Sequence, residues 1–170
     1  ILSNDGSIYV EPIEPEPIPI EPVEPYIPTV DEVQRSKLLE ISRVCQSIIF
    51  NGTEVATSKG NQHFSLSLED QTNLSFALSS IMGGMTEFPY HADGELCKMY
   101  SAEDIILIGE TLTEFKLYHT TYCNHLNMWI KRCKTIEEVY EISYGVSLPG
   151  DLDESFVSII GISTIQEVVE

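Results

Sequence analysis

The most regular hydrophobic pattern of the chain lies between residues 101 and 133. Mostly apolar side chains recur there three and four positions apart for four heptads, the spacing of one face of an α-helix. These positions are Ile105, Ile108, Leu112, Phe115, His119, Tyr122, Leu126, Trp129 and Cys133. The pattern predicts a helix of about 32 residues, roughly 48 Å long, which exceeds the needs of a small domain. We therefore expect part of it to pack on another subunit.

Four helix starts are marked by a hydroxyl residue followed three positions later by an acid, the pattern of a capping box. The pairs are Thr29 with Glu32, Ser67 with Asp70, Ser101 with Asp104, and Thr135 with Glu138. Together with the apolar spacing that follows, they predict helices over about 30–48, from 67 to the glycines at 83 and 84, along the long pattern above, and from 135 to about 145.

Two β-hairpins are predicted between these helices. The first runs from Val55 to Leu66 around Lys59-Gly60-Asn61, and the second from Tyr90 to Met99 around Asp93-Gly94, a dipeptide typical of a type I′ turn. Residues 155–169 are left unassigned, because β-branched side chains are frequent among apolar positions that would otherwise suit a helix.

Seven of the nine prolines fall within the 17 residues from Pro12 to Pro28. Each proline fixes φ and keeps the preceding residue out of the α region, so this arm is expected to be extended, over roughly 50 Å. It carries six large apolar side chains: Ile13, Ile18, Ile20, Val23, Tyr26 and Ile27. Either the arm is a solvated acidic linker, or these six candidate partner-binding residues dock on a partner. We expect it to pack chiefly on other chains rather than on residues 35–149.

The expected fold class is α+β, mainly helical. An extended Pro-rich arm (1–29) precedes a small domain (30–149) of about four helices, one of them long, and two β-hairpins. An acidic C-terminal tail (150–170) of unassigned structure follows.

Charge narrows the range of partners. The chain has 9 basic and 27 acidic residues and a net charge of −18, and residues 1–34 hold 8 acids and no base. Recognition of phosphate needs clustered cations, so we expect no nucleic-acid partner and no docking on anionic lipid. No apolar run is long enough for a membrane span, and no signal peptide is recognised.

The residues suited to chemistry are sparse. The four cysteines lack a CxxC spacing, so structural thiols are expected, with a disulfide as the alternative. His119 and Cys123 have the i, i+4 spacing of metal ligands, but the sequence specifies no further ligand. We expect His119 to be a seam histidine, that is, one that lies on the apolar face of the long helix, at least half buried and bonded to a neighbour. His91 and Cys97 form the weakest candidate pair, a thiol nucleophile with its base. No catalytic residue, metal or cofactor is therefore assigned.

Four blocks carry a resemblance: HFSLSLEDQTNLSFAL (63–78), FPYHADGELCKMYSAEDI (88–105), FKLYHTTYCNHLNMWI (115–130) and YGVSLP (144–149). In this order they resemble a small domain of unknown function in tail-region proteins of phages and prophages of Gram-positive bacteria. The resemblance covers about residues 35–149. It implies no enzyme activity, and it implies that the variable N-terminal part joins the particle.

The function expected from this resemblance is structural. The chain would be a non-enzymatic part of a phage tail, baseplate or fibre attachment, or of a phage-tail-like bacteriocin, made in the host cytoplasm and located in the tail region of the virion. Its partners would be other tail or baseplate proteins and copies of itself in a symmetric ring. The alternatives are a tail-fibre assembly chaperone absent from the mature particle and a cell-wall hydrolase.

Overall fold

The structure is a computed structural model that describes residues 25–166. It is α+β and mainly helical, with 62% helix and two small antiparallel sheets, which confirms the expected class. The part of the expected arm before residue 25 lies outside the described residues. In chain order the elements are α1 (Val30–Asn51), β1 (Thr53–Thr57), β2 (Gly60–Phe64), α2 (Leu68–Met82), β3 (Glu87–Tyr90), β4 (Lys98–Ser101), α3 (Ala102–Arg132), α4 (Ile136–Tyr140) and α5 (Gly150–Gln166).

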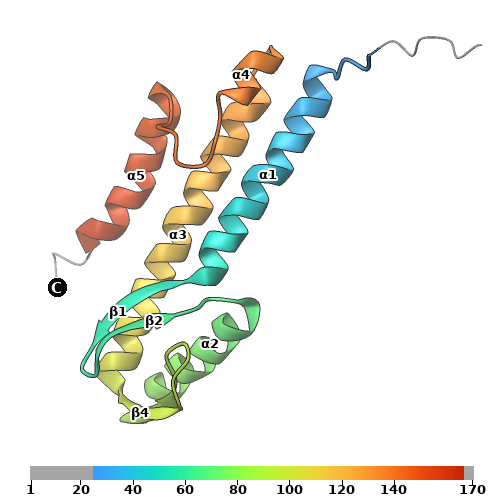
Figure 1. Cartoon of the computed structure of the whole chain (residues 1–170). Coiled ribbons are helices and arrows are strands. Elements are labelled where there is room, and N and C mark those ends of the chain that lie inside the picture. The colour runs from blue at the N-terminus through green and yellow to red at the C-terminus, as the bar shows by residue number, and fades with distance from the viewer. Residues whose placement is uncertain (1–24, 167–170) are drawn as a thin grey trace, which may run out of the picture.

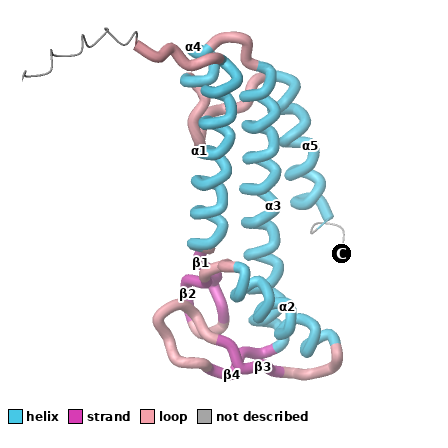
Figure 2. The backbone as a smooth tube through the Cα atoms, turned by 90° about the vertical axis from the view of Figure 1, so that its right-hand side faces the viewer, coloured by secondary structure: helices cyan, strands magenta, loops and turns pink. Residues whose placement is uncertain are grey.

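Helix α3 is the central element, against which most of the others pack. Figures 1 and 2 show α1 and α5 lying along it, with α2 and the two hairpins gathered at its N-terminal end and α4 at the opposite end. Where α2 crosses α3, a Cβ built on Gly109 would lie 2.8 Å from both methyl carbons of Leu78. A glycine in mid-helix weakens α3 by about 1 kcal/mol relative to alanine, but here it lets the two helices approach closely.

The 31 residues of α3 confirm the predicted long helix. Its length serves two separate hydrophobic clusters. The first, at the hairpin end, includes Phe64, Tyr100 and Ile108, and the second, towards α4 and α5, includes Leu126 and Ile142. A helix that must reach both clusters needs this length within one chain. Packing of α3 on another subunit stays a prediction.

Three of the four capping boxes form as predicted, at Thr29, Ser67 and Thr135. At the start of α3 only half of the box forms, because the backbone N–H of Asp104 donates to Ser101 but the Asp104 carboxylate is used elsewhere. It accepts hydrogen bonds from the backbone nitrogen of Ser58 (2.8 Å) and from its hydroxyl (2.6 Å). The turn of the first hairpin is thereby attached to the N-terminus of α3.

Both hairpins exist, but their turns differ from the prediction. In the first, Thr57 pairs with Gly60, so Ser58 and Lys59 form the loop. In the second, Tyr90 pairs with Lys98 across a loop over residues 91–97. The type I′ turn is wrong because it needs positive φ at both central residues, whereas Gly94 (φ 73°) has it and Asp93 does not. Positive φ at the second central position alone is typical of a type II turn.

The largest difference lies at the C-terminus. Residues 150–166, for which no structure was assigned, form α5, so the described chain has five helices rather than about four. Leu152 and Phe156 of α5 are only 6% and 9% exposed, in the second hydrophobic cluster. Packing of this face on α3 outweighs the weak helix propensity of the β-branched residues in the segment.

None of the helices described combines the length and the apolar character that crossing a membrane requires.

Candidate functional site

The candidate partner-binding residues belong to the arm, and the structure describes its last part. Ile13, Ile18, Ile20 and Val23 lie outside the described residues, whereas Tyr26 and Ile27 are 75% and 79% exposed. Both belong to the extended stretch before α1, which leaves the domain at the end where α4 lies (Figure 1). Exposure agrees with a role in binding, and docking itself stays a prediction.

The direction in which the arm leaves the domain is set by Glu32. Hydrogen bonds from the Tyr26 hydroxyl and from the backbone and hydroxyl of Thr29 lower the pKa of Glu32 to about 2. A carboxylate in the first helical turn also interacts favourably with the helix dipole. The ionised Glu32 thus ties Tyr26 to the start of α1 at any physiological pH.

A pocket of about 240 Å³ lies beside residues 25–29, which we call the root of the arm. Tyr26 and Pro28 of the arm line it together with Val33 of α1 and Tyr140 of α4, and Tyr140 is 63% exposed. Glu32, Ser36, Lys37 and Glu40 also line it, so the pocket combines apolar and charged side chains next to two exposed arm residues. Nothing in the sequence marked Tyr140, since it is a lone aromatic residue in an acidic helix more than 100 positions from the arm.

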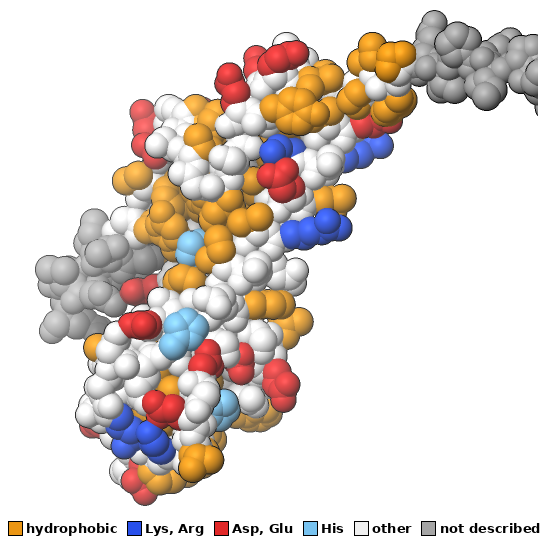
Figure 3. Space-filling model, viewed as in Figure 1, with side chains coloured by type: hydrophobic (Ala, Val, Ile, Leu, Met, Phe, Trp, Pro, Cys, Tyr) orange, Lys and Arg blue, Asp and Glu red, His pale blue; other side chains and the backbone are white. Residues whose placement is uncertain are grey.

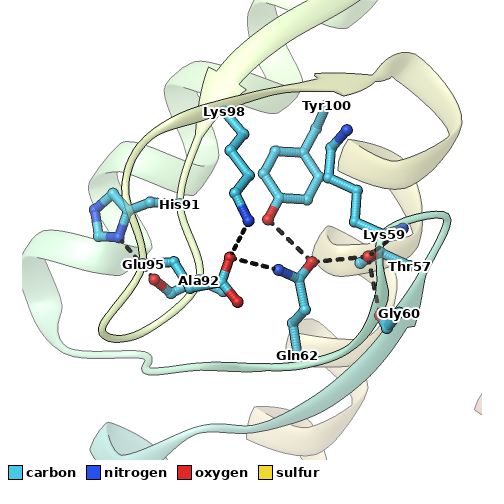
Figure 4. Close-up of polar contacts among 9 residues, drawn as sticks. All are labelled: Thr57, Lys59, Gly60, Gln62, His91, Ala92, Glu95, Lys98 and Tyr100. Carbon is cyan, nitrogen blue, oxygen red and sulfur yellow. Dashed lines mark hydrogen bonds and ion pairs between the residues drawn. The ribbon is translucent and has the colours of Figure 1, made fainter.

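A network of polar side chains joins the hairpins at the other end of the molecule (Figure 4). The buried Gln62 accepts hydrogen bonds from the hydroxyls of Thr57 (2.9 Å) and Tyr100 (3.0 Å), and it donates to Glu95 (3.0 Å). Glu95 also pairs with Lys98. Because the polar groups of Gln62 are bonded within the protein, this network stabilises the contact between the hairpins.

A second polar cluster brings two of the resemblance blocks together. Asp93, in the loop over residues 91–97, lies 2.8 Å from Nδ1 of His63 and accepts a hydrogen bond from the hydroxyl of Ser65 (2.9 Å). Burial by itself raises the pKa of Asp93, but these hydrogen bonds outweigh it and hold the pKa below its usual value.

This cluster differs from a Ser-His-Asp triad. In a triad the histidine bridges the other two residues, whereas here the carboxylate of Asp93 does. The single hydroxyl proton of Ser65 is shared between Asp93 and a second carboxylate, that of Asp70 (3.0 Å). The arrangement holds the loop against β2, and it joins the Ser65 hydroxyl to carboxylates rather than to a histidine.

The remaining chemical candidates are Cys97 with His91, His119 and Cys123. Cys97 is exposed, and the ring of His91 lies 3.3 Å from the carbonyl oxygen of Ala92. His119 is partly buried, with Nδ1 2.7 Å from the hydroxyl of Tyr144, which confirms it as a seam histidine bonded to a neighbour. Burial raises the pKa of Cys123 to about 12, so this thiol stays protonated and unreactive.

All four cysteines are free thiols in the structure. Within residues 25–166 no three His, Cys, Asp or Glu side chains gather as a metal site would require.

No family model matches the chain, and neither a curated protein nor a solved structure shows a significant match to it.

Proposed function

We propose that this chain is a structural, non-enzymatic component of a phage tail, baseplate or fibre-attachment assembly, or of a phage-tail-like bacteriocin, and that its N-terminal arm attaches it to neighbouring subunits. The observation that carries the proposal is the exposure of apolar side chains at the root of the arm. Tyr26 and Ile27 stand exposed beside the pocket that Val33 and Tyr140 line. The assignment to a phage tail rests on the resemblance of the four sequence blocks to tail-region proteins.

The energetics suit attachment by many weak contacts. Full burial of one such side chain contributes at most about 1.5–3 kcal/mol, from which the entropy of ordering the arm is subtracted. In a symmetric ring the same contact repeats in every subunit, so individually weak anchors add up to firm attachment. Residues 1–34 carry 8 acids and no base, so the surface that receives the arm is expected to be basic.

The proposal is tested by the copy number of the chain in particles purified from a strain that encodes it, measured by quantitative mass spectrometry. A structural component is present in a fixed, stoichiometric number of copies per particle. A chain that is abundant in the lysate but absent from purified particles is instead an assembly chaperone. Release of peptidoglycan fragments by the purified chain would contradict a non-enzymatic role and favour the hydrolase.

The role of the arm is tested separately by the double variant Tyr26→Ser/Ile27→Ser. It leaves the capping box of Thr29 and Glu32 in place, and thermal melting checks that the domain stays folded. We expect its incorporation into particles to fall roughly tenfold or more. The matched control is Leu39→Ser, which removes a 58% exposed apolar side chain from α1. Normal incorporation of the double variant would place the attachment outside the root of the arm.

A further inference from the structure

A second pocket, of about 380 Å³ and thus larger than the one near the arm, lies beside the middle of α3. Tyr118 and Tyr122 of α3, Tyr144 of the loop before α5, and Phe156 of α5 contribute aromatic rings to its wall. Figure 3 shows hydrophobic side chains gathered on this face, between α5 and α1. The volume falls within the range of sites that bind small molecules.

The four rings hold one another in place. The ring centroids of Tyr118 and Phe156 are 5.3 Å apart with the planes at 77°, and those of Tyr122 and Tyr144 are 5.2 Å apart at 86°. Tyr122 also meets Phe156 edge to face at 5.8 Å. Edge-to-face contacts of this kind are favourable, so the wall is formed before any ligand arrives.

The polar ends of the buried tyrosines are already used within the protein. The hydroxyl of Tyr122 donates to the carbonyl oxygen of Val146 and accepts from the backbone nitrogen of Gly145 (3.1 Å). The hydroxyl of Tyr144 is bonded to His119 (2.7 Å). The hydroxyl groups of Tyr122 and Tyr144 are therefore not available to a ligand in this pocket, which meets their aromatic rings instead.

Asp153, on the first turn of α5, is the one acidic residue of the wall, and neither lysine nor arginine is among the residues that line it. His119 also lines the wall, and burial lowers its pKa, so the neutral imidazole is favoured at neutral pH. The electron-rich faces of aromatic rings attract cations, and a nearby carboxylate adds to the attraction. A pocket with these aromatic rings and the Asp153 carboxylate therefore favours an organic cation over a neutral or anionic ligand.

We propose that this aromatic cavity, formed by Tyr118, Tyr122, Tyr144 and Phe156 with Asp153, binds a methylated ammonium group. A primary ammonium carries three N–H donors and is strongly hydrated, so it would lose more hydrogen bonds with water than this wall replaces. A trimethylammonium group has no donors to satisfy and presents methyl groups to the rings. The inference is independent of the proposed function, because it rests on this cavity and not on the arm.

The binding test uses the full chain and follows its aromatic signals by NMR. Choline is compared with 3,3-dimethylbutan-1-ol, which has the same shape without the charge, and with n-butylammonium, which has a primary ammonium. We expect saturable shifts with choline and binding weaker by about 2- to 30-fold for the neutral alcohol. Equal binding of the alcohol would show a merely apolar cavity and overturn the proposal. So would stronger binding of n-butylammonium, or no saturation by choline at tens of millimolar.

A further titration with acetylated trimethyllysine amide distinguishes two sources of the same group. Tighter binding of this compound than of choline assigns the group to the side chain of a modified protein, and the reverse order assigns it to a free small molecule or head group.

Variants locate the binding in this cavity. Tyr118 is 44% exposed, and Tyr118→Leu removes its ring while keeping an apolar side chain beside Phe156. Thermal melting checks that the variant stays folded. We expect it to weaken choline binding by about 2- to 30-fold, whereas Tyr118→Phe keeps the ring and the affinity. Asp153→Asn should weaken binding of choline but not of the neutral alcohol. Tyr140→Leu, at the pocket near the arm, is the matched control, and unchanged binding by Tyr118→Leu overturns the proposal.

Discussion

At the scale of single residues, burial decides the chemistry of His119. Its ring packs against Phe115, with the centroids 4.5 Å apart, and Nδ1 lies 2.7 Å from the hydroxyl of Tyr144. Burial lowers the pKa of His119 below its ordinary value of 6.5, since the charged ring would lose its hydration. The neutral imidazole is therefore the form that the folded protein favours.

This pKa shift predicts how stability depends on pH. Between the folded pKa and 6.5 the unfolded chain binds more protons than the native one, so stability falls as the pH drops below 6.5. In His119→Asn, where the amide oxygen replaces Nδ1 as partner of Tyr144, this contribution should vanish. Urea unfolding at pH 7.5 and 5.5 measures it, with His91→Asn as the exposed control. An unchanged pH dependence in His119→Asn would contradict the prediction.

Two glycines share the same positive φ but differ in the space around them, and Gly52, with ψ −158°, also lies in a region essentially restricted to glycine. Gly52 and Gly94 both have φ 73°. A Cβ at Gly94 meets nothing within 4 Å, whereas at Gly52 it would lie 1.8 Å from the carbonyl oxygen of Phe64. We expect Gly94→Ala to cost about 1 kcal/mol from strain alone.

Gly52→Ala should cost several-fold more than Gly94→Ala, because the carbonyl of Phe64 belongs to β2 and cannot move freely. Denaturant unfolding compares the two variants. Equal losses of stability would mean that the chain around Gly52 relaxes without penalty.

At the scale of elements, Asp104 connects the first hairpin with the start of α3. It is only 5% exposed, and its carboxylate accepts both hydrogen bonds from Ser58. Burial raises its pKa, but the bonds from Ser58 outweigh this and keep the pKa below its usual value of 3.8. The carboxylate is therefore ionised at neutral pH and bonded to the turn.

Asp104→Ala should reduce stability by about 2 kcal/mol or more, since hydrogen bonds to a charged group contribute about 1.5–3 kcal/mol. Glu103→Ala is the matched control, because it removes a neighbouring, exposed acid from the same helical turn. The difference from the wild type should shrink as the pH falls from about 3.8, where the carboxyl of the unfolded chain takes up its proton, through the lower pKa that Asp104 has in the native state. A difference that persists unchanged at low pH would show that the charge contributes nothing.

At the scale of the whole molecule, α1 and α3 join two hydrophobic clusters. The cluster at the hairpin end contains Val55 and Tyr100, and the cluster at the arm end contains Val139 and Leu152. The described side chains of α5, up to residue 161, contribute to the second cluster and not to the first. We therefore expect a change that weakens the second cluster to loosen α4 and α5 more than the hairpins.

Leu152→Ala tests this expectation. Leu152 is 6% exposed, and its truncation should cost about 2–5 kcal/mol by leaving a cavity. Val157 lies on the same helix and is 57% exposed, so Val157→Ala should reduce stability by no more than about 0.5 kcal/mol. Hydrogen exchange followed by mass spectrometry should show faster exchange in α4 and α5 than in β1 and β2. Equal acceleration in all four elements would mean that the two clusters unfold as one unit.

The candidate site was only partly predictable from the sequence. Tyr26 and Ile27 could be named, because prolines on both sides keep a segment extended and expose its side chains. Tyr140 and the rings of Tyr118, Tyr144 and Phe156 gave no signal of their own. Their positions depend on how α4 and α5 fold back on α1 and α3.

By itself the sequence determined the features that residues three or four positions apart control. The helix starts at Thr29, Ser67 and Thr135, the length of α3 and the positive φ of Gly94 follow from such local interactions. Tertiary structure alone decided that residues 150–166 form a helix and that Asp104 binds Ser58 rather than completing its capping box. The partners of these groups lie tens of residues away, so the free energy that selects them appears only when the distant segments pack together.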